Sequence, residues 1–145
     1  MREIWGKAMR KAILITLLAI ANAGMAADVA KWSVVDGREA FTIYADTGTI
    51  RRNGNLAQMW DMTDAKTGKA LGGVKKSQST RMEREYECSK QQIRMLYVSW
   101  HAANMGGGEI VGSDDTAGAW QPMMLGTIGE RLWRIACGTE NARRL

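Results

Sequence analysis

Two cysteines, Cys88 and Cys137, are the residues whose chemistry most constrains this sequence. They are separated by 48 intervening residues, whereas redox-active pairs usually lie close together in a Cys-x-x-Cys motif. In an oxidising compartment this pair is expected to form one structural disulfide. Closing a loop of about 50 residues stabilises a domain by roughly 4 kcal/mol in the chain-entropy model. Free thiols or metal ligands are the alternatives.

The other side chains that could do nucleophilic or acid–base chemistry form no recognisable catalytic pattern. Covalent catalysis by serine or cysteine needs an adjacent base, and the single histidine, His101, has no nucleophile motif near it. The carboxylate pairs Asp61 with Asp64 and Glu83 with Glu85 could do acid–base work, but solvated strand and turn positions explain them more simply. The sequence therefore predicts no catalytic residues and a protein that is not an enzyme.

Neither a phosphate-binding loop nor a metal site is expected. The three glycines at 106–108 lack the Lys-Ser or Lys-Thr that follows such a loop, so they are interpreted as a turn. Seven methionines downstream of residue 26 could offer thioethers to copper(I), but no Met-x-Met or Met-His cluster accompanies them: Met59, Met62, Met82, Met95, Met105, Met123 and Met124. Core packing is the preferred interpretation, and no cofactor or metal is predicted.

The N-terminal segment has the order of a secretory signal peptide. Four basic residues precede an uncharged apolar run at 12–21, which is followed by small residues. The run is about half as long as the roughly 20 apolar residues that span a bilayer. We expect residues 1–26 to be cleaved after Ala26, with Ala27 as the alternative, which leaves no transmembrane segment. A short buried helix is the competing interpretation.

Removal of residues 1–26 leaves 119 residues, the usual size of one domain. Residues 27–145 are therefore predicted to form a single domain with a core over about 31–138. The formal net charge falls from +5 to +2, because the removed segment carries four basic residues and one acidic residue. No nucleic-acid partner is expected, since such binding needs a basic patch on the domain itself.

Short β-branched and aromatic runs separated by glycine-rich turns predict antiparallel strands. Asp36-Gly37 suits a tight hairpin turn, residues 46–48 suit the next turn, and Gly54 lies in a turn that closes a second hairpin. In the run 56–63, side chains alternate between faces, and Trp60 is expected to mark the buried face.

Residues 79–88 and 92–100 are predicted to be two further strands, although residues 83–97 also suit a helix. In the first of these strands, Tyr86 and Cys88 are expected to point inward. The opposite face is expected to be a solvated acidic stripe: Glu83, Glu85 and Glu87.

A helix is predicted to begin after Thr127. Thr127 and Glu130 have the spacing of a capping box, and Gly138 suits the left-handed C-cap of the same helix. Leu132 and Ile135 would share its apolar, core-facing side. So short a helix is marginal alone in water, and docking onto the sheet with a Cys137–Cys88 bond would hold it.

The sequence resembles the bacterial surface-adhesin protein E family over about residues 32–137. The resemblance rests on the order and spacing of several short motifs together with the two cysteines: Thr49-Ile50-Arg51-Arg52-Asn53-Gly54-Asn55, Met59-Trp60-Asp61-Met62-Thr63-Asp64, Arg84-Glu85-Tyr86-Glu87-Cys88, Met105-Gly106-Gly107-Gly108, Trp120-Gln121-Pro122 and Gly129-Glu130-Arg131-Leu132-Trp133-Arg134-Ile135-Ala136-Cys137. It implies an α+β fold, in which a curved antiparallel sheet of about six strands carries a C-terminal helix fastened by the disulfide.

The resemblance also implies a function in the cell envelope. The best-known family member is a lipid-anchored outer-surface adhesin that recruits host proteins such as vitronectin, laminin and plasminogen. Homodimers are implied as well. This chain shows no cysteine after the apolar run, so both the periplasm and the cell surface are expected locations.

Two functions follow from these observations. The first is adhesin-like binding of a protein partner, or of an anionic glycan, through an exposed strand edge or through the polar connection after residue 65. That connection carries four candidate partner-binding residues: Lys66, Lys69, Lys75 and Lys76. Solvated loop lysines are the simpler interpretation of these residues. The second function is a soluble periplasmic structural, assembly or ligand-binding module with no adhesion role.

Overall fold

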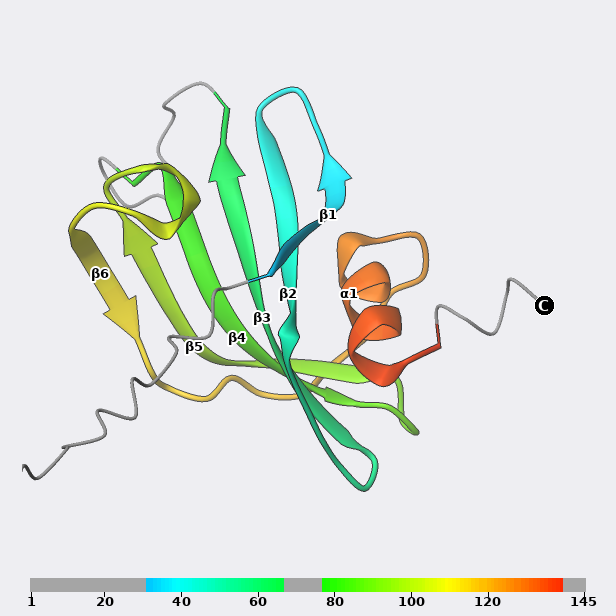
Figure 1. Cartoon of the computed structure of the whole chain (residues 1–145). Coiled ribbons are helices and arrows are strands. Elements are labelled where there is room, and N and C mark those ends of the chain that lie inside the picture. Colours follow the sequence, from blue (N-terminus) through cyan, green and yellow to red (C-terminus); the bar gives the residue numbers. More distant parts are fainter. Residues whose placement is uncertain (1–30, 67–76, 140–145) are drawn as a thin grey trace, which may run out of the picture.

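A computed structural model describes residues 31–66 and 77–139. They form one antiparallel sheet with one α-helix against it (Figure 1). The elements follow in chain order: β1 (Trp32–Gly37), β2 (Phe41–Asn53), β3 (Leu56–Ala65), β4 (Ser79–Glu87), β5 (Gln92–His101), the 3₁₀ turn η1 (Asn104–Gly106), β6 (Ile110–Asp114), β7 (Gln121–Pro122) and α1 (Ile128–Cys137). The predicted fold class is confirmed, whereas the alternative helix over residues 83–97 is wrong.

The strands lie in the order β1-β2-β3-β4-β5-β6, and the two-residue β7 also pairs with β5. From β1 to β6, strands that are neighbours in sequence are thus neighbours in the sheet. The sheet is bent, and α1 lies in its hollow against β1 to β4 (Figure 1). No helix among residues 31–66 and 77–139 is long and apolar enough to cross a membrane. The predicted signal peptide falls on residues outside the described ranges.

The first hairpin turn differs from the sequence prediction. Asp36-Gly37 is the end of β1 and pairs with β2. The chain reverses at residues 38–40 instead, where the Arg38 N–H donates to the Phe41 carbonyl oxygen at 2.8 Å. A bulge at Val35 shifts the register of β1, and the extra residue moves the reversal further along the chain.

The expected turn at residues 46–48 lies inside β2. The Gly48 N–H donates to the Asp46 carboxylate at 3.1 Å, and the Thr49 hydroxyl donates to the Asp46 carbonyl oxygen at 2.7 Å. These local bonds accompany a register shift between Asp46 and Arg51, so the strand bends where it was expected to reverse. The second hairpin does turn at Gly54, whose φ of 57° suits glycine.

The two faces of β3 are the reverse of the sequence prediction. Ala57, Met59 and Asp61 point toward α1 and are at most 2% exposed, whereas Trp60 lies half-buried on the other face. The helix approaches the sheet over small side chains, with Ala45 and Ala57 almost fully buried beneath it, and an indole would not fit in that space. We call the side that α1 covers the helix face and the opposite side the outer face.

The acidic stripe predicted for β4 is also only partly solvated. Glu85 is 6% exposed on the outer face, because Arg94 of β5 lies opposite it and pairs with its carboxylate. Tyr86 points to the helix face and is fully buried. Burial is a consequence of the neighbouring strands, which alternation within a single strand does not reveal.

The ends of α1 satisfy their free backbone groups with side chains and turns. The Glu130 N–H donates to the Thr127 hydroxyl at 3.3 Å, and the Glu130 carboxylate accepts from the Gly126 N–H at 2.6 Å. At the other end Gly138 has φ 77° and the Thr139 N–H donates to the Arg134 carbonyl oxygen, a Schellman motif. The helix therefore begins at Ile128 and ends at Cys137, as predicted.

A disulfide fastens the end of α1 to the sheet. Cys88 and Cys137 are joined, with their Cα atoms 5.7 Å apart. Leu132 and Ala136 are at most 1% exposed and Trp133 is 7% exposed, and the partly buried Ile135 packs against the same cluster. The Arg52 side chain donates to the Ala136 carbonyl oxygen at 2.8 Å, which places a cation at the helix C-terminus.

Removing the disulfide should destabilise the whole domain. We expect the double variant Cys88→Ser/Cys137→Ser to lose roughly 3–4 kcal/mol and to melt about 10–20 °C lower, as followed by circular dichroism. Reductant should lower the melting temperature of the wild type to the same value and leave the variant unchanged. An unaltered melting temperature in the variant would contradict a structural role for the bond.

Candidate functional site: an apolar groove beside the helix

The helix face carries an open groove where α1 does not cover the sheet. One cavity of about 440 Å³ lies over β4 and β5, and its lining is mostly apolar: Thr63, Thr80, Met82, Met95, Val98, Trp100 and Asp114. A second cavity of about 430 Å³ shares Met95 with the first: Arg84, Ile93, Arg94, Met95, Gly118, Ala119 and Gln121. We call the two together the groove. Each has the volume of a ligand-sized site.

Strand register explains why these side chains meet. Residues directly opposite one another in an antiparallel pair point to the same face. Thr63 lies opposite Thr80, Thr80 opposite Trp100, and Trp100 opposite Gly112. Because Gly112 has no side chain, β6 leaves the Trp100 ring open on that side, and an added Cβ would lie 3.4 Å from it.

An ion pair between a buried carboxylate and a groove-lining arginine lies where the groove meets the core. The Arg84 guanidinium donates to the Asp61 carboxylate at 2.6 Å. The Asp61 side chain is 3% exposed and the Arg84 side chain is 28% exposed. Burial raises the pKa of Asp61, and the Arg84 charge opposes that rise. Burial by itself would lower the pKa of Arg84. The charge of the Asp61 carboxylate and its hydrogen bond outweigh this effect, so the pKa of Arg84 is raised overall. Arg84 is thus neutralised within the structure.

Tyr86 completes this buried cluster. Its hydroxyl is buried and makes no hydrogen bond within residues 31–66 and 77–139. Burial, and secondly the Asp61 carboxylate, raises the pKa of Tyr86 well above its ordinary value. Tyr86 is therefore a neutral side chain of the core cluster, and it offers no charge to a ligand in the groove.

The rim of the groove at β6 is acidic. Asp114 is exposed, and hydrogen bonds from the Thr116 backbone and side chain hold its pKa below the usual value. Asp115 is exposed beside it. Since Arg84 is paired, the free charge at the groove is negative, which favours a basic group on a bound molecule.

Strand β6 also presents a free edge next to the groove. It is the last strand in the sheet order, and within the part of the chain that the structure describes no strand pairs with its outer side. Ile110 on this strand is 53% exposed. Unpaired N–H and C=O groups on an edge strand can accept another extended chain.

The lysines proposed for partner binding are not brought together by the described structure. Lys66 follows β3 and is exposed, with its backbone N–H donating to the Ala40 carbonyl oxygen at 2.9 Å. The other three lie outside the described residues: Lys69, Lys75 and Lys76. The lysine hypothesis stays a prediction.

One pair of side chains has the contact that covalent catalysis would need. The Ser99 hydroxyl lies 2.9 Å from Nε2 of His101, but the two residues are only 3% and 5% exposed. Nδ1 of His101 has no hydrogen-bond partner among the described residues, so no carboxylate orients the ring. Burial and the nearby Arg81 charge lower the pKa of His101, which keeps the imidazole neutral.

The groove was not predicted from the sequence, because all seven methionines were interpreted alike as core residues. Met59 and Met62 are fully buried, whereas Met82 and Met95 line the groove. A signal was present, since Met82 and the half-exposed Trp100 lie on predicted strands and Met side chains suit adaptable binding surfaces. The sequence does not indicate which strands α1 leaves uncovered.

The chain matches a known protein family over most of its described length. A family model described as surface-adhesin protein E matches residues 32–138, more than half of the chain. Among curated proteins no significant match is found.

Solved structures of Haemophilus influenzae protein E share the fold. Crystal form II is 12% identical with a TM-score of 0.54, and the match covers 74% of this chain and 94% of that one. The structure of protein E from non-typeable H. influenzae is 10% identical with a TM-score of 0.50, covering 74% of this chain and 81% of that one. At such low identity the likeness shows the fold alone.

Removing one member of the Asp61–Arg84 ion pair should destabilise the protein more than replacing both members with apolar residues. We expect Asp61→Asn to lose about 3 kcal/mol in urea denaturation, because it leaves the partly buried Arg84 charge without its counter-ion. The double variant Asp61→Leu/Arg84→Met should lose less than this single variant. As a control, Arg38→Gln removes an exposed partner of Asp36 and should change stability by under about 1 kcal/mol. A double variant that loses as much stability as Asp61→Asn, or more, would contradict a coupled buried pair.

Proposed function

The chain belongs to the surface-adhesin protein E family, and from that membership we propose that it is an exported, non-enzymatic protein of the bacterial cell envelope that binds a partner protein. The observation that carries this proposal is the apolar groove beside the free edge of β6. The partner is a host matrix or serum protein, or another protein of the envelope.

The groove and the edge together suit an extended segment of the partner. Such a segment would add to β6 through main-chain hydrogen bonds and direct alternate side chains over the groove, where Trp100 of β5 is the nearest large ring. A basic side chain on the segment would face Asp114. Apolar anchors in a desolvated pocket, with charged groups at the rim, are the usual arrangement of a binding hot spot.

Two features support the non-enzymatic part of the proposal. Ser99 and His101 are buried away from any substrate. Of the carboxylates considered for acid–base work, Asp61 and Glu85 are held by Arg84 and Arg94. A general acid or base needs a proton that it can exchange with a bound substrate, and these paired groups are occupied by structural roles.

Binding can be tested with the host proteins that the family suggests as partners. We expect vitronectin, laminin or plasminogen, immobilised for surface plasmon resonance, to bind the wild type, and Met95→Glu to weaken that binding by about 30-fold or more through a charge in the groove. Met124→Glu is the matched control, because Met124 is 68% exposed outside the groove. Binding that survives Met95→Glu would remove the groove from the proposal. No binding to any of the three would favour the periplasmic module without an adhesion role.

Export can be tested by intact mass on separated periplasmic, membrane and secreted fractions. The proposal predicts a chain beginning at Ala27 or Asp28 whose mass is two hydrogens short of the reduced form. Recovery at the cell surface would favour adhesion, and recovery in the soluble periplasm would favour the structural or assembly module. A full-length reduced chain in the cytoplasm would contradict export. Sedimentation of the same material tests the homodimer that the family implies.

A further inference from the structure

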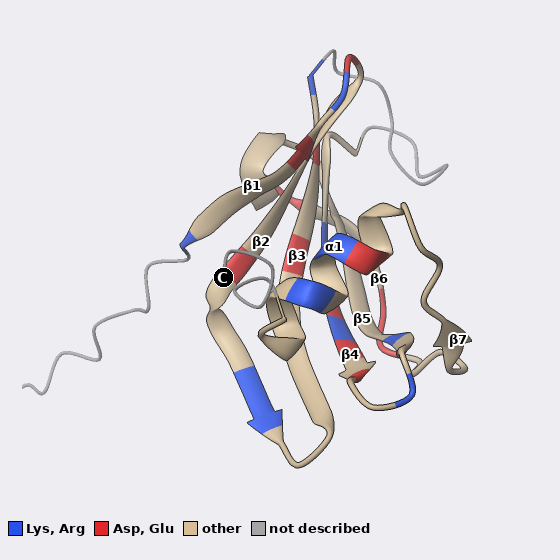
Figure 2. Ribbon diagram, turned by 90° about the vertical axis from the view of Figure 1, so that its right-hand side faces the viewer, with Lys and Arg blue, Asp and Glu red and all other residues tan. Residues whose placement is uncertain are grey.

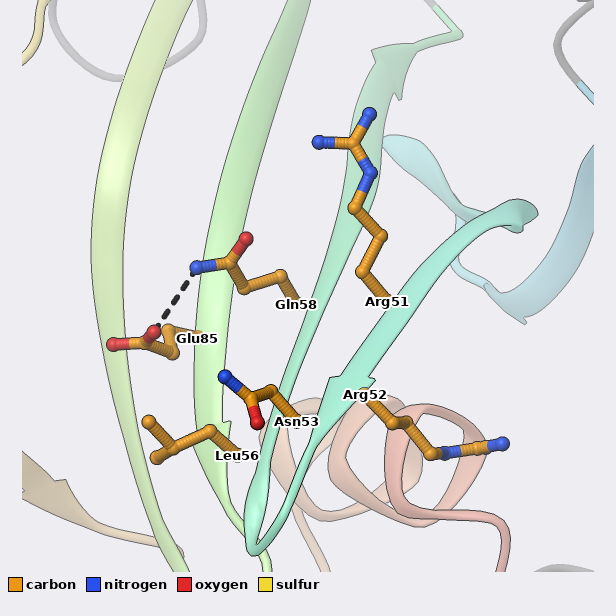
Figure 3. A pocket seen from close by; sticks show the side chains of 6 residues that line it. All are labelled: Arg51, Arg52, Asn53, Leu56, Gln58 and Glu85. Atoms are coloured by element: carbon orange, nitrogen blue, oxygen red, sulfur yellow. Dashed lines mark hydrogen bonds between the residues drawn. The ribbon is translucent and has the colours of Figure 1, made fainter.

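A small polar cavity lies on the outer face, on the far side of the sheet from the groove. Its volume is about 180 Å³, and six residues from the β2–β3 hairpin and β4 line it: Arg51, Arg52, Asn53, Leu56, Gln58 and Glu85 (Figure 3). It lies at the basic end of β2 (Figure 2).

A row of polar side chains crosses four strands at this place. Arg51 lies opposite Gln58, Gln58 opposite Glu85, and Glu85 opposite Arg94. The Glu85 carboxylate accepts from the Gln58 amide at 3.0 Å and from the Arg94 guanidinium at 2.7 Å. Glu85 is thereby neutralised, and the amide of Gln58 is held in one orientation.

This fixed amide leaves an acceptor facing the cavity. In Figure 3 the nitrogen of Gln58 points to Glu85, whereas its oxygen points toward the side where Arg51 lies. Arg51 is exposed and has no hydrogen bond or ion pair with any residue of the described part of the chain. Arg52 is turned away and donates to the Ala136 carbonyl oxygen. The same cavity is thus lined by an unpaired guanidinium, on Arg51, and by an unpaired carbonyl oxygen, on Gln58, as far as the described residues go.

We propose that this cavity binds an acidic sugar, a hexuronate residue of a glycan. The planar carboxylate of the sugar pairs with the Arg51 guanidinium through two parallel hydrogen bonds. A ring hydroxyl donates to the Gln58 oxygen, and the Asn53 amide, which can donate and accept, takes a second hydroxyl. Leu56 lies against the apolar side of the ring.

The donor and acceptor set distinguishes a sugar acid from other anions. Fully ionised phosphate offers acceptors to Arg51 but no donor for the Gln58 oxygen, and an acidic peptide offers backbone N–H donors in place of the several ring hydroxyls that a sugar acid carries. Further along the outer face, about 7 Å from Gln58 along β3, the half-buried rings of Trp60 and Tyr97 lie 5.7 Å apart. They provide apolar surface for the next sugar of a chain.

The test is titration of the whole exported domain, followed by ¹⁵N NMR. The probe is a tetrasaccharide of alternating glucuronate and N-acetylglucosamine, and the comparison ligands are the neutral N-acetylglucosamine tetrasaccharide and tetraglutamate. We expect the acidic tetrasaccharide to shift the Gln58 side-chain amide and the Trp60 indole signals. Arg51→Gln should weaken this binding about 10-fold or more.

The matched control is Arg131→Gln, which removes the same charge from an exposed position on α1 and should leave the affinity unchanged. Thermal melts of both variants check that the fold is retained. No shift up to millimolar acidic sugar, or shifts that persist in Arg51→Gln, would overturn the proposal. Equal binding of the neutral tetrasaccharide would remove the role of the carboxylate, and stronger binding of tetraglutamate would assign the cavity to acidic peptides instead.

Discussion

The docking of a ten-residue helix onto a bent sheet is the constraint on which the rest of the structure depends. α1 is too short to be stable alone in water, and without it the apolar centre of the helix face, including Met59, would be exposed. The two are held together by the buried Leu132 and Ala136 and by the Cys88–Cys137 bond. Capping at Thr127 and Gly138 satisfies backbone groups that would otherwise compete with this packing.

The shortness of α1 also creates the groove. The helix packs mainly on β1 to β4, and among the described residues Ile93 is the part of β5 that packs against the core cluster; the helix face over the rest of β5 carries the groove. The Asp61–Arg84 pair lies where the closed core meets the open groove. Replacing such a pair with apolar residues is often neutral or stabilising, so the main effect that we assign to the pair is the fixed arrangement of side chains at the groove. A strand edge, an apolar floor and an acidic rim are then available at one place.

The outer face has a different chemistry, built from guanidinium groups and aromatic rings. The Arg81 guanidinium lies 5.6 Å from the Trp32 ring and 5.3 Å from the Trp60 ring, and Arg94 lies 4.5 Å from the Trp120 ring. These cation–π contacts keep large rings half-exposed without leaving them free to aggregate. Arg94 links the two faces, because it lines the groove and pairs with Glu85 of the outer-face cavity.

The sequence alone determined the elements whose signals are local. The capping box and Gly138 predicted α1 from Ile128 to Cys137, Gly54 marked a hairpin, and the two cysteines predicted the bond that joins helix and sheet. Only the tertiary structure decided which face of β3 is buried, because the fit under α1 depends on Ala45 of another strand and excludes the Trp60 indole. The same holds for Glu85, whose burial depends on Arg94 across the sheet, and for the groove, whose existence depends on how far a docked helix extends. Caps and turns depend on hydrogen bonds between residues close in sequence, so the sequence predicts them. Burial and binding surfaces depend on residues far apart in sequence, which come into contact only after the strands have paired.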